Sequence, residues 1–238
     1  MKKNETPEVE VKEIPAAVAL ITAEVVFLII ASLVSISTLI LIIRRIFIVK
    51  TTDFDEKGFD VFGTLVTDTN TQIALVITFF GSYVFMVTAW LTLMGYYLFV
   101  RKNKRRFINI FIIALSNFGL MVGLKFFFNR PRPLVPLLNE IPGLSFPSGH
   151  AFMGTIFYGL LISIVYREVK VVWKKWLFIF ILLCFIILVG LSRVYLRVHY
   201  LSDVLAGFCF GTLSLIIFLW LIKRMEKYNA VKLSVLRK

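Results

Sequence analysis

The chain has 238 residues, of which 59% are hydrophobic and 15% are aromatic. This apolar share exceeds that of soluble domains, and it comes in runs of about 16 to 30 residues, the length that crosses a bilayer. The net charge of +13 would suggest nucleic-acid binding in a soluble protein. Here most basic residues flank the apolar runs, where membrane orientation and anionic headgroups account for them. Composition therefore predicts a one-domain integral membrane protein without a nucleic-acid partner.

The first apolar run, residues 16–43, is too long for a signal-peptide core and ends without a clear cleavage site. We predict that it stays in the protein as the first membrane helix. Glu24 lies inside this run, where a carboxylate is costly, and it has either a structural role near the interface or a role in proton relay. The segment 51–70 carries five acidic residues among apolar ones at roughly helical spacing. An amphipathic surface helix and an irregular loop both remain open for it.

Five further apolar runs follow and complete a predicted bundle of six membrane helices. They cover residues 71–100, 107–124, 150–166, 176–191 and 204–222. Five prolines between residues 131 and 147 rule out a continuous helix in the connection 125–149. Ser148 follows the last of these prolines and precedes an apolar run, so we predict it as the N-cap of the fourth helix.

The cysteines and histidines do not form a metal site in the sequence. Cys184 and Cys209 are isolated inside apolar runs, where they behave as small hydrophobic residues. Two isolated cysteines and two histidines do not match a zinc-binding spacing. We therefore expect neither a disulfide, nor a metal, nor another cofactor.

Three polar stretches stand out against the apolar background: KFFFNRPRP at 125–133, PSGH at 147–150 and SRVYLRVHYLSD at 192–203. The chain has two histidines, and both lie in these stretches. His199 and Asp203 are four residues apart, a spacing that on a helix would bring the carboxylate to the imidazole and fix its tautomer. Arg193 adds a planar cationic group that suits phosphate oxygens.

Read in order, the stretches give K-x6-R-P, P-S-G-H and S-R-x5-H-x3-D, which resembles the type 2 phosphatidic acid phosphatase (PAP2) superfamily of lipid phosphatases. The match runs from Lys125 to Asp203, about a third of the chain. The resemblance implies a metal-independent double displacement through a phosphohistidine. It assigns catalytic roles to the nucleophile His199, to His150 as acid and base, and to Asp203, which orients His199. It assigns phosphate binding to Lys125, Arg132, Ser148, Gly149 and Arg193.

The distribution of basic residues predicts the orientation in the membrane. With six helices, both tails lie on the same side of the membrane as the connections 101–106 and 167–175. This side, with tails 1–15 and 223–238, holds 18 of the 27 basic residues. The positive-inside rule places these two tails in the cytoplasm. All three motifs then lie at the extracytoplasmic face of the membrane domain, residues 16–222, in the cell membrane.

We therefore expect a lipid phosphate phosphatase whose substrate keeps its tail in the bilayer. The bacterial proteins that this chain resembles act on phosphatidylglycerol phosphate, phosphatidic acid or undecaprenyl pyrophosphate, and no residue chooses among these. A lipid phosphotransferase that uses the same phosphohistidine is the main alternative. A transporter is a weaker alternative, because we find neither repeat symmetry nor broken helices. Vanadium-dependent haloperoxidases share the anion-site pattern, but they are soluble.

Overall fold

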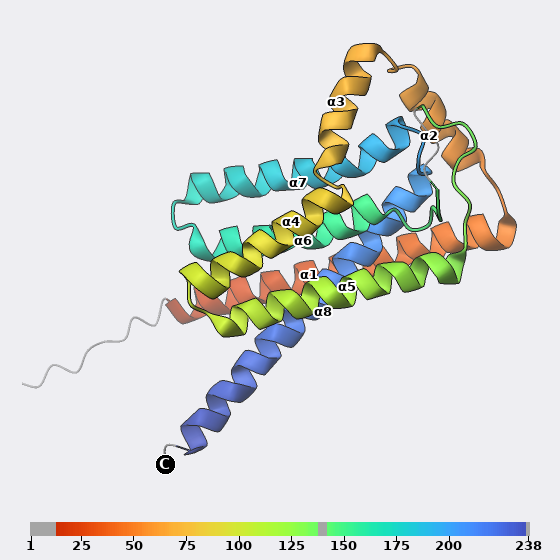
Figure 1. The fold of residues 1–238 in the computed structure, drawn as a ribbon. Helices are drawn as coiled ribbons and strands as arrows, with labels where there is room; N and C mark the ends of the chain where they lie inside the picture. The colour runs from red at the N-terminus through yellow and green to blue at the C-terminus, as the bar shows by residue number, and fades with distance from the viewer. Residues whose placement is uncertain (1–12, 138–141, 237–238) are drawn as a thin grey trace, which may run out of the picture.

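The computed structural model describes residues 13–137 and 142–236, and the side chains of residues 25–137 and 142–225. All regular structure in these ranges is helical, and most helices run side by side in one bundle (Figure 1). Six helical stretches are long and apolar enough to cross a membrane. The predicted all-helical bundle of six membrane helices is therefore confirmed.

The helices lie where the hydropathy predicted them, within a few residues at each end, except that the last helix continues well past residue 222, to Leu236. The first span is α1 (Glu13–Ile43), continued by the wider turns of η1 (Arg44–Val49). The remaining long spans are α5 (Lys104–Phe128), α6 (Gly149–Glu168), α7 (Val172–Tyr195) and α8 (Leu201–Leu236). The side chain of Glu24, for which we expected a structural or a proton-relay role, lies outside the side chains that the structure describes.

The second apolar run is broken, contrary to our expectation that no membrane helix is interrupted. It consists of α3 (Asp68–Phe79), α4 (Tyr83–Gly95) and η2 (Tyr96–Val100), and α3 leaves the bundle direction at a steep angle (Figure 1). Gly81 lies in the break, where a Cβ atom would come within 2.5 Å of Val189 Cγ1 and 2.7 Å of His150 Cδ2. A side chain does not fit there, so the break lets the chain pass directly over α6 and α7.

The acidic segment after the first span contains a helix, α2 (Asp53–Gly63). Of the two predictions for residues 51–70, a helix and an irregular loop, the structure confirms a helix for residues 53–63. Gly58 faces the start of α8, where a Cβ atom would come within 3.0 Å of Leu201 Cβ. The absence of a side chain at this position therefore allows α2 to lie directly on α8, beside the ends of α7 and α8 (Figure 1).

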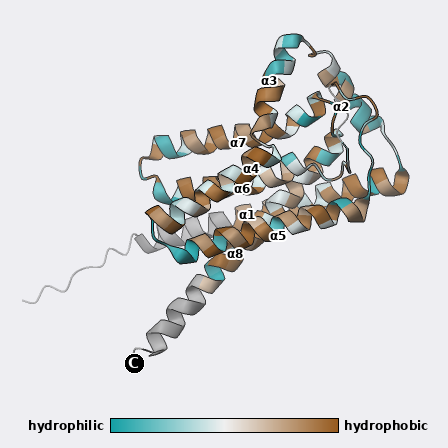
Figure 2. Cartoon of the chain, in the orientation of Figure 1, coloured by the Kyte–Doolittle hydropathy of each residue, from teal (hydrophilic) through white to brown (hydrophobic). Residues whose placement is uncertain are grey.

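Hydrophobic residues predominate along the long helices, and hydrophilic residues gather mainly toward the helix ends and in the connections (Figure 2). Many large apolar side chains are more than half exposed, as expected for a surface that faces lipid; examples are Phe27, Val84, Leu115, Phe180 and Trp220. Membrane embedding, predicted from composition, thus agrees with the distribution of side chains over the fold.

The helix α6 is the centre of the bundle and packs between α7 and α8. Two glycines on α8 make the approach to α6 possible. A Cβ atom at Gly207 would lie 2.8 Å from the Ser148 carbonyl oxygen, and one at Gly211 would lie 2.9 Å from the Phe152 carbonyl oxygen. Small residues four apart allow such close backbone contact between membrane helices. This contact brings the start of α8 against the start of α6.

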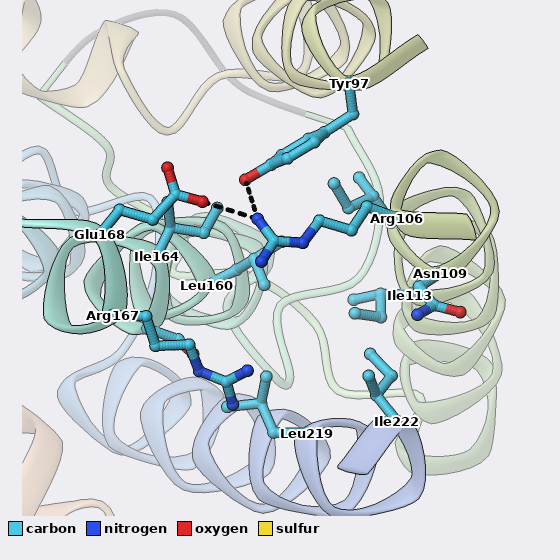
Figure 3. Close-up of a pocket in the computed structure, with 12 residues that line it drawn as sticks. Tyr97, Arg106, Asn109, Ile113, Leu160, Ile164, Arg167, Glu168, Leu219 and Ile222 are labelled. Carbon is cyan, nitrogen blue, oxygen red and sulfur yellow. Dashed lines mark hydrogen bonds and ion pairs between the residues drawn. The ribbon is translucent and has the colours of Figure 1, made fainter. Parts of the chain in front are cut away.

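At the other end of the bundle, Arg106 connects α5 with α6 and η2. Its Nη1 lies 2.6 Å from Glu168 Oε1 and 3.2 Å from the Tyr97 hydroxyl (Figure 3). These side chains border a pocket of about 110 Å3. The residues that line it include no residue of the three motifs, so this pocket is distinct from the candidate site.

The contact between α6 and α8 makes a stability prediction. We expect Gly207→Ala to destabilise the protein, because the added Cβ meets backbone that cannot move aside, and overpacking of this kind costs ~1–3 kcal/mol. Gly119→Ala on α5 is the matched control, because nothing lies within 4 Å of its Cβ position. Thermal unfolding in detergent measures both. Equal midpoints for the two variants would contradict this account of the packing.

Candidate active site

The three motifs meet at one end of the bundle, where α5, α6, α7 and α8 begin or end. Lys125 lies in the last turn of α5 and Arg193 in the last turn of α7. His150 lies in the first turn of α6 and Asp203 in the first turn of α8. Each polar residue therefore comes from a helix end, where an unbroken apolar run stops and a charged group is less costly to place.

The starts of α6 and α8 are joined by a backbone hydrogen bond. The Ser148 N–H donates to the Asp203 carbonyl oxygen over 3.0 Å. This N–H already has an acceptor, so of the polar groups of Ser148 only the side chain is free to meet a phosphate. Ser148 is the N-cap of α6 as predicted, but its hydroxyl makes no capping bond. The hydroxyl is buried and has no hydrogen-bond partner among the described residues, so it is available to a ligand.

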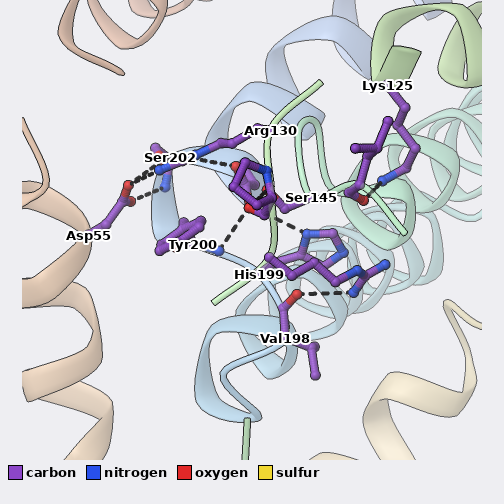
Figure 4. A network of polar contacts seen from close by, with 12 residues as sticks. Asp55, Lys125, Arg130, Ser145, Val198, His199, Tyr200 and Ser202 are labelled. Atoms are coloured by element: carbon purple, nitrogen blue, oxygen red, sulfur yellow. Dashed lines mark hydrogen bonds and ion pairs between the residues drawn. The ribbon is translucent and has the colours of Figure 1, made fainter. Parts of the chain in front are cut away.

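His199 and Asp203 meet as predicted, but not on the face of a helix. His199 lies in the turn before α8 (Figure 4). Its Nδ1 is 3.5 Å from Asp203 Oδ2. The same carboxylate oxygen accepts the Tyr200 N–H over 3.0 Å. Asp203 thus caps the start of α8 while it faces the imidazole. The geometry arises because the His199 backbone turns back, its N–H donating to the Arg193 carbonyl oxygen over 3.3 Å.

Three cationic side chains predicted to bind phosphate are held by neutral acceptors. Lys125 Nζ donates to the Leu144 carbonyl over 2.6 Å, Arg132 to the Val198 carbonyl over 3.0 Å, and Arg193 to the Thr78 hydroxyl over 2.7 Å. These contacts orient the three groups without neutralising their charge. The Nε atoms of both arginines are buried and have no acceptor within the described part of the chain. Oriented positive charge with unused donors is suited to an anion such as phosphate.

His150 lies between this cationic cluster and an apolar pocket. Its electrostatic neighbours are Arg193, His199, Arg132 and Lys125, which places both histidines beside the same charges. A pocket of about 160 Å3 opens on the other side of His150 and Gly149, between α4, α5 and α6. It is lined mostly by apolar side chains from those helices: Met86, Val87, Trp90, Phe118, Met121 and Met153. The site thus combines a cationic side and an apolar side.

Burial and positive charge keep His199 neutral. Its side chain is 2% exposed. Burial, followed by the charges of Arg132, Arg193 and Lys125, lowers the pKa of His199 well below its ordinary value of 6.5. A neutral imidazole has a lone pair on one ring nitrogen. Asp203 Oδ2 faces Nδ1 at 3.5 Å, and a proton on Nδ1 would leave the lone pair on Nε2.

Two residues of this region were missed by the sequence analysis. Arg130 binds both Asp203 and Asp55 through its two terminal nitrogens, at 2.6 Å and 2.7 Å. The stretch KFFFNRPRP contains two Arg–Pro pairs, and the sequence analysis gave a role only to the second, at Arg132. The repeated Arg–Pro pair was the sequence feature that could have drawn attention to Arg130. No sequence signal singled out Asp55, because nothing near it in the chain resembles the motifs.

The fold and the site define an integral membrane protein with two histidines, a buried one at 199 and a partly buried one at 150, beside a cluster of cationic side chains at one end of its bundle. The family model of the PAP2 superfamily matches residues 106–227, which include all three motifs. The match covers half of the chain, and the chain belongs to the PAP2 superfamily.

Individual relatives agree with this assignment. The chain is 38% identical to phosphatidylglycerophosphatase B of Bacillus subtilis over 92 residues, 38% of this chain and 45% of that protein. It is 34% identical to sphingosine-1-phosphate phosphatase 1 of Rattus norvegicus over 106 residues, 42% of this chain and 24% of that protein. The aligned part therefore spans less than half of these curated relatives.

A solved structure extends the similarity to most of the fold. The crystal structure of a transmembrane PAP2 type phosphatidylglycerolphosphate phosphatase from Bacillus subtilis superimposes with a TM-score of 0.69 at 25% identity. The alignment covers 83% of this chain and 96% of that one. The arrangement of membrane helices around the motifs is thus shared by the two proteins.

The electrostatics of His199 can be tested directly, because the chain has two histidines. In His150→Gln, His199 is the sole histidine, and its 15N ring signals report one titration. We expect the midpoint to lie below 6.5, with the neutral ring at neutral pH. Replacing Arg132 with Gln in addition removes a positive charge and should raise the midpoint. A midpoint at or above 6.5 in His150→Gln would contradict the inferred environment.

Proposed function

We propose that the protein is a lipid phosphate phosphatase that works through a phosphohistidine. The observation that carries the proposal is the convergence of His199 and His150 with three cations that have no carboxylate partner in the described structure. A phosphoryl group supplies the negative charge that this cluster lacks. Preorganised positive groups of this kind stabilise the charge that develops on the transferring phosphoryl oxygens.

In the first step, His199 Nε2 attacks phosphorus in line with the leaving oxygen. The N–P bond forms while the P–O bond to the lipid breaks, and His150 donates a proton to the departing oxygen. Asp203 faces Nδ1 at 3.5 Å and stabilises the positive charge that the ring gains. In the second step, His150 takes a proton from water, which attacks phosphorus and releases phosphate and neutral His199.

Lys125, Arg132 and Arg193 would bind the phosphoryl oxygens, together with the Ser148 hydroxyl and the start of α6 at Gly149. A helix N-terminus attracts anions through its N–H groups and its dipole. Three fixed positive charges balance a phosphate dianion with one charge to spare. This is the basis for proposing that the reaction requires no metal ion.

The position of the site supports a lipid substrate. The apolar pocket beside His150 and Gly149 opens between α4 and α5, where exposed residues such as Tyr83 and Phe118 face the membrane. A lipid that enters from the bilayer keeps its chain on this apolar side and its phosphate on the cationic side. The names of the two Bacillus relatives make phosphatidylglycerol phosphate the first candidate. Phosphatidic acid and undecaprenyl pyrophosphate follow.

We further propose that the site lies on the extracytoplasmic side and both tails lie in the cytoplasm. The support is the excess of Lys and Arg in the two tails and in the connections around 101–106 and 167–175. The motifs lie at the opposite ends of the same helices. The lipid phosphate would then come from the outer leaflet of the cell membrane.

Phosphate release by the purified protein in detergent tests the proposed function. We expect release from phosphatidylglycerol phosphate in the presence of EDTA, and no release in His199→Ala. Phosphatidic acid and undecaprenyl pyrophosphate, assayed in parallel, rank the substrates. Equal release by wild type and His199→Ala would overturn the proposal. Phosphate transfer only after addition of a lipid alcohol would favour the phosphotransferase instead.

The two roles of His150 predict a separable kinetic defect. An aryl phosphate such as p-nitrophenyl phosphate has a leaving group that needs little protonation, so His150→Ala should still form the phosphohistidine from it. Without a base for water, the second step should slow by about 10²–10⁴-fold. We expect a burst of one equivalent of nitrophenol followed by slow turnover, measured by stopped flow. A uniform loss without a burst would contradict the second role of His150.

A further inference from the structure

We propose that Asp55 and Arg130 are positioning residues for His199: they hold the Asp203 carboxylate in the orientation in which Oδ2 faces the imidazole. Neither residue contacts the cationic cluster that would bind the phosphoryl group, and neither is assigned a role by the motifs. The inference rests on the proposed function, because it names groups that support the proposed nucleophile.

The orientation of the Asp203 side chain is the feature that needs support. The last torsion of an aspartate has no sharply preferred value, so neighbouring groups must define the plane of the carboxylate. Arg130 Nη1 donates to Oδ1 over 2.6 Å, while the Tyr200 N–H donates to Oδ2 over 3.0 Å (Figure 4). With one oxygen held by each donor, Oδ2 stays 3.5 Å from His199 Nδ1.

Arg130 is itself held on three sides. Its Nη2 donates to Asp55 Oδ2 over 2.7 Å, and its Nη1 also donates to the Ser202 hydroxyl over 2.8 Å. Its guanidinium carbon lies 4.0 Å from the centre of the Tyr200 ring, a cation–π contact. The side chain is 9% exposed and therefore has little freedom. A lysine lacks the planar fork that presents a separate nitrogen to each carboxylate, and it lacks the flat face that lies against Tyr200.

Asp55 connects this group to α2. Its Oδ1 accepts the Ser202 N–H over 2.9 Å and its Oδ2 accepts the Ser202 hydroxyl over 2.8 Å. Asp55 is 2% exposed, although it belongs to a helix whose other acidic side chains are exposed. A single carboxylate of α2 thus points inward and fixes both Arg130 and the first turn of α8, which carries Asp203.

The charges of the group fit the proposed reaction. Asp55, Arg130 and Asp203 together carry one negative charge, and their side chains are at most 9% exposed. When the N–P bond forms, the His199 ring becomes positive, and the net negative charge beside it stabilises this state. Without the charge of Asp55, the group is neutral and stabilises the ring less. The phosphate-binding cations are unaffected, so the effect should fall on kcat and not on KM.

A double-mutant cycle distinguishes positioning from a purely structural role. Asp55→Asn keeps the shape of the side chain and the Oδ1 acceptor, and we expect it to lower kcat about tenfold with KM unchanged. In an Asp203→Asn background, the same substitution should have little further effect on kcat. The effects of residues that act as a unit do not add. Asp60→Asn, an exposed acidic residue of the same helix, is the matched control and should leave kcat unchanged.

Arg130→Lys is the second variant, and Arg106→Lys at the opposite end of the bundle is its control. Arg106 also pairs with a carboxylate at 2.6 Å, but it lies outside the site. We expect Arg130→Lys to lower kcat and Arg106→Lys to preserve it, with thermal midpoints measured in parallel. Equal kcat losses from Asp55→Asn in both backgrounds, or unchanged kcat in Asp55→Asn and Arg130→Lys, would overturn the inference. The variant His199→Ala separates failure of this inference from failure of the proposed function. If the proposed function is wrong, His199→Ala retains activity.

Discussion

The contact between the first turns of α6 and α8 is the interaction on which the site depends. It includes a backbone hydrogen bond from the Ser148 N–H to the Asp203 carbonyl, and Gly207 lets the two helices touch there. Through it, the helix that carries His150 is placed against the segment that carries His199. Since both histidines lie at helix starts, a small shift between the two helices changes the distance between them directly.

The same end of the bundle concentrates positive charge where burial makes charge costly. Lys125, Arg132 and Arg193 are oriented by carbonyl and hydroxyl oxygens, which satisfy donors but leave the charge unbalanced. An arrangement of this kind opposes the stability of the empty protein and favours a bound anion. Burial lowers the pKa of His199 most, and the neighbouring cations lower it further, so the same arrangement contributes to the neutral state of the imidazole.

Negative charge in this region is kept apart from the cations. Asp203 and Asp55 are both buried and both bound by Arg130, which holds them on the α2 side of His199. The imidazole therefore lies between a net negative group and a positive one. A ring that alternates between neutral and positive forms is suited to that place. In the proposed transfer, the carboxylates would stabilise the positive ring and the cations would stabilise the phosphoryl oxygens.

The sequence by itself determined the class of fold, because runs of apolar residues long enough to cross a bilayer have few alternatives to a helix. It also determined the residues of the three motifs and their meeting at one end, since their positions follow from the helix boundaries. Tertiary structure decided the rest. His199 meets Asp203 through a turn before α8, and Gly81 breaks the second span against His150. Asp55 and Arg130 join the site from positions 75 residues apart, a contact between distant residues that no local pattern of hydropathy or spacing encodes.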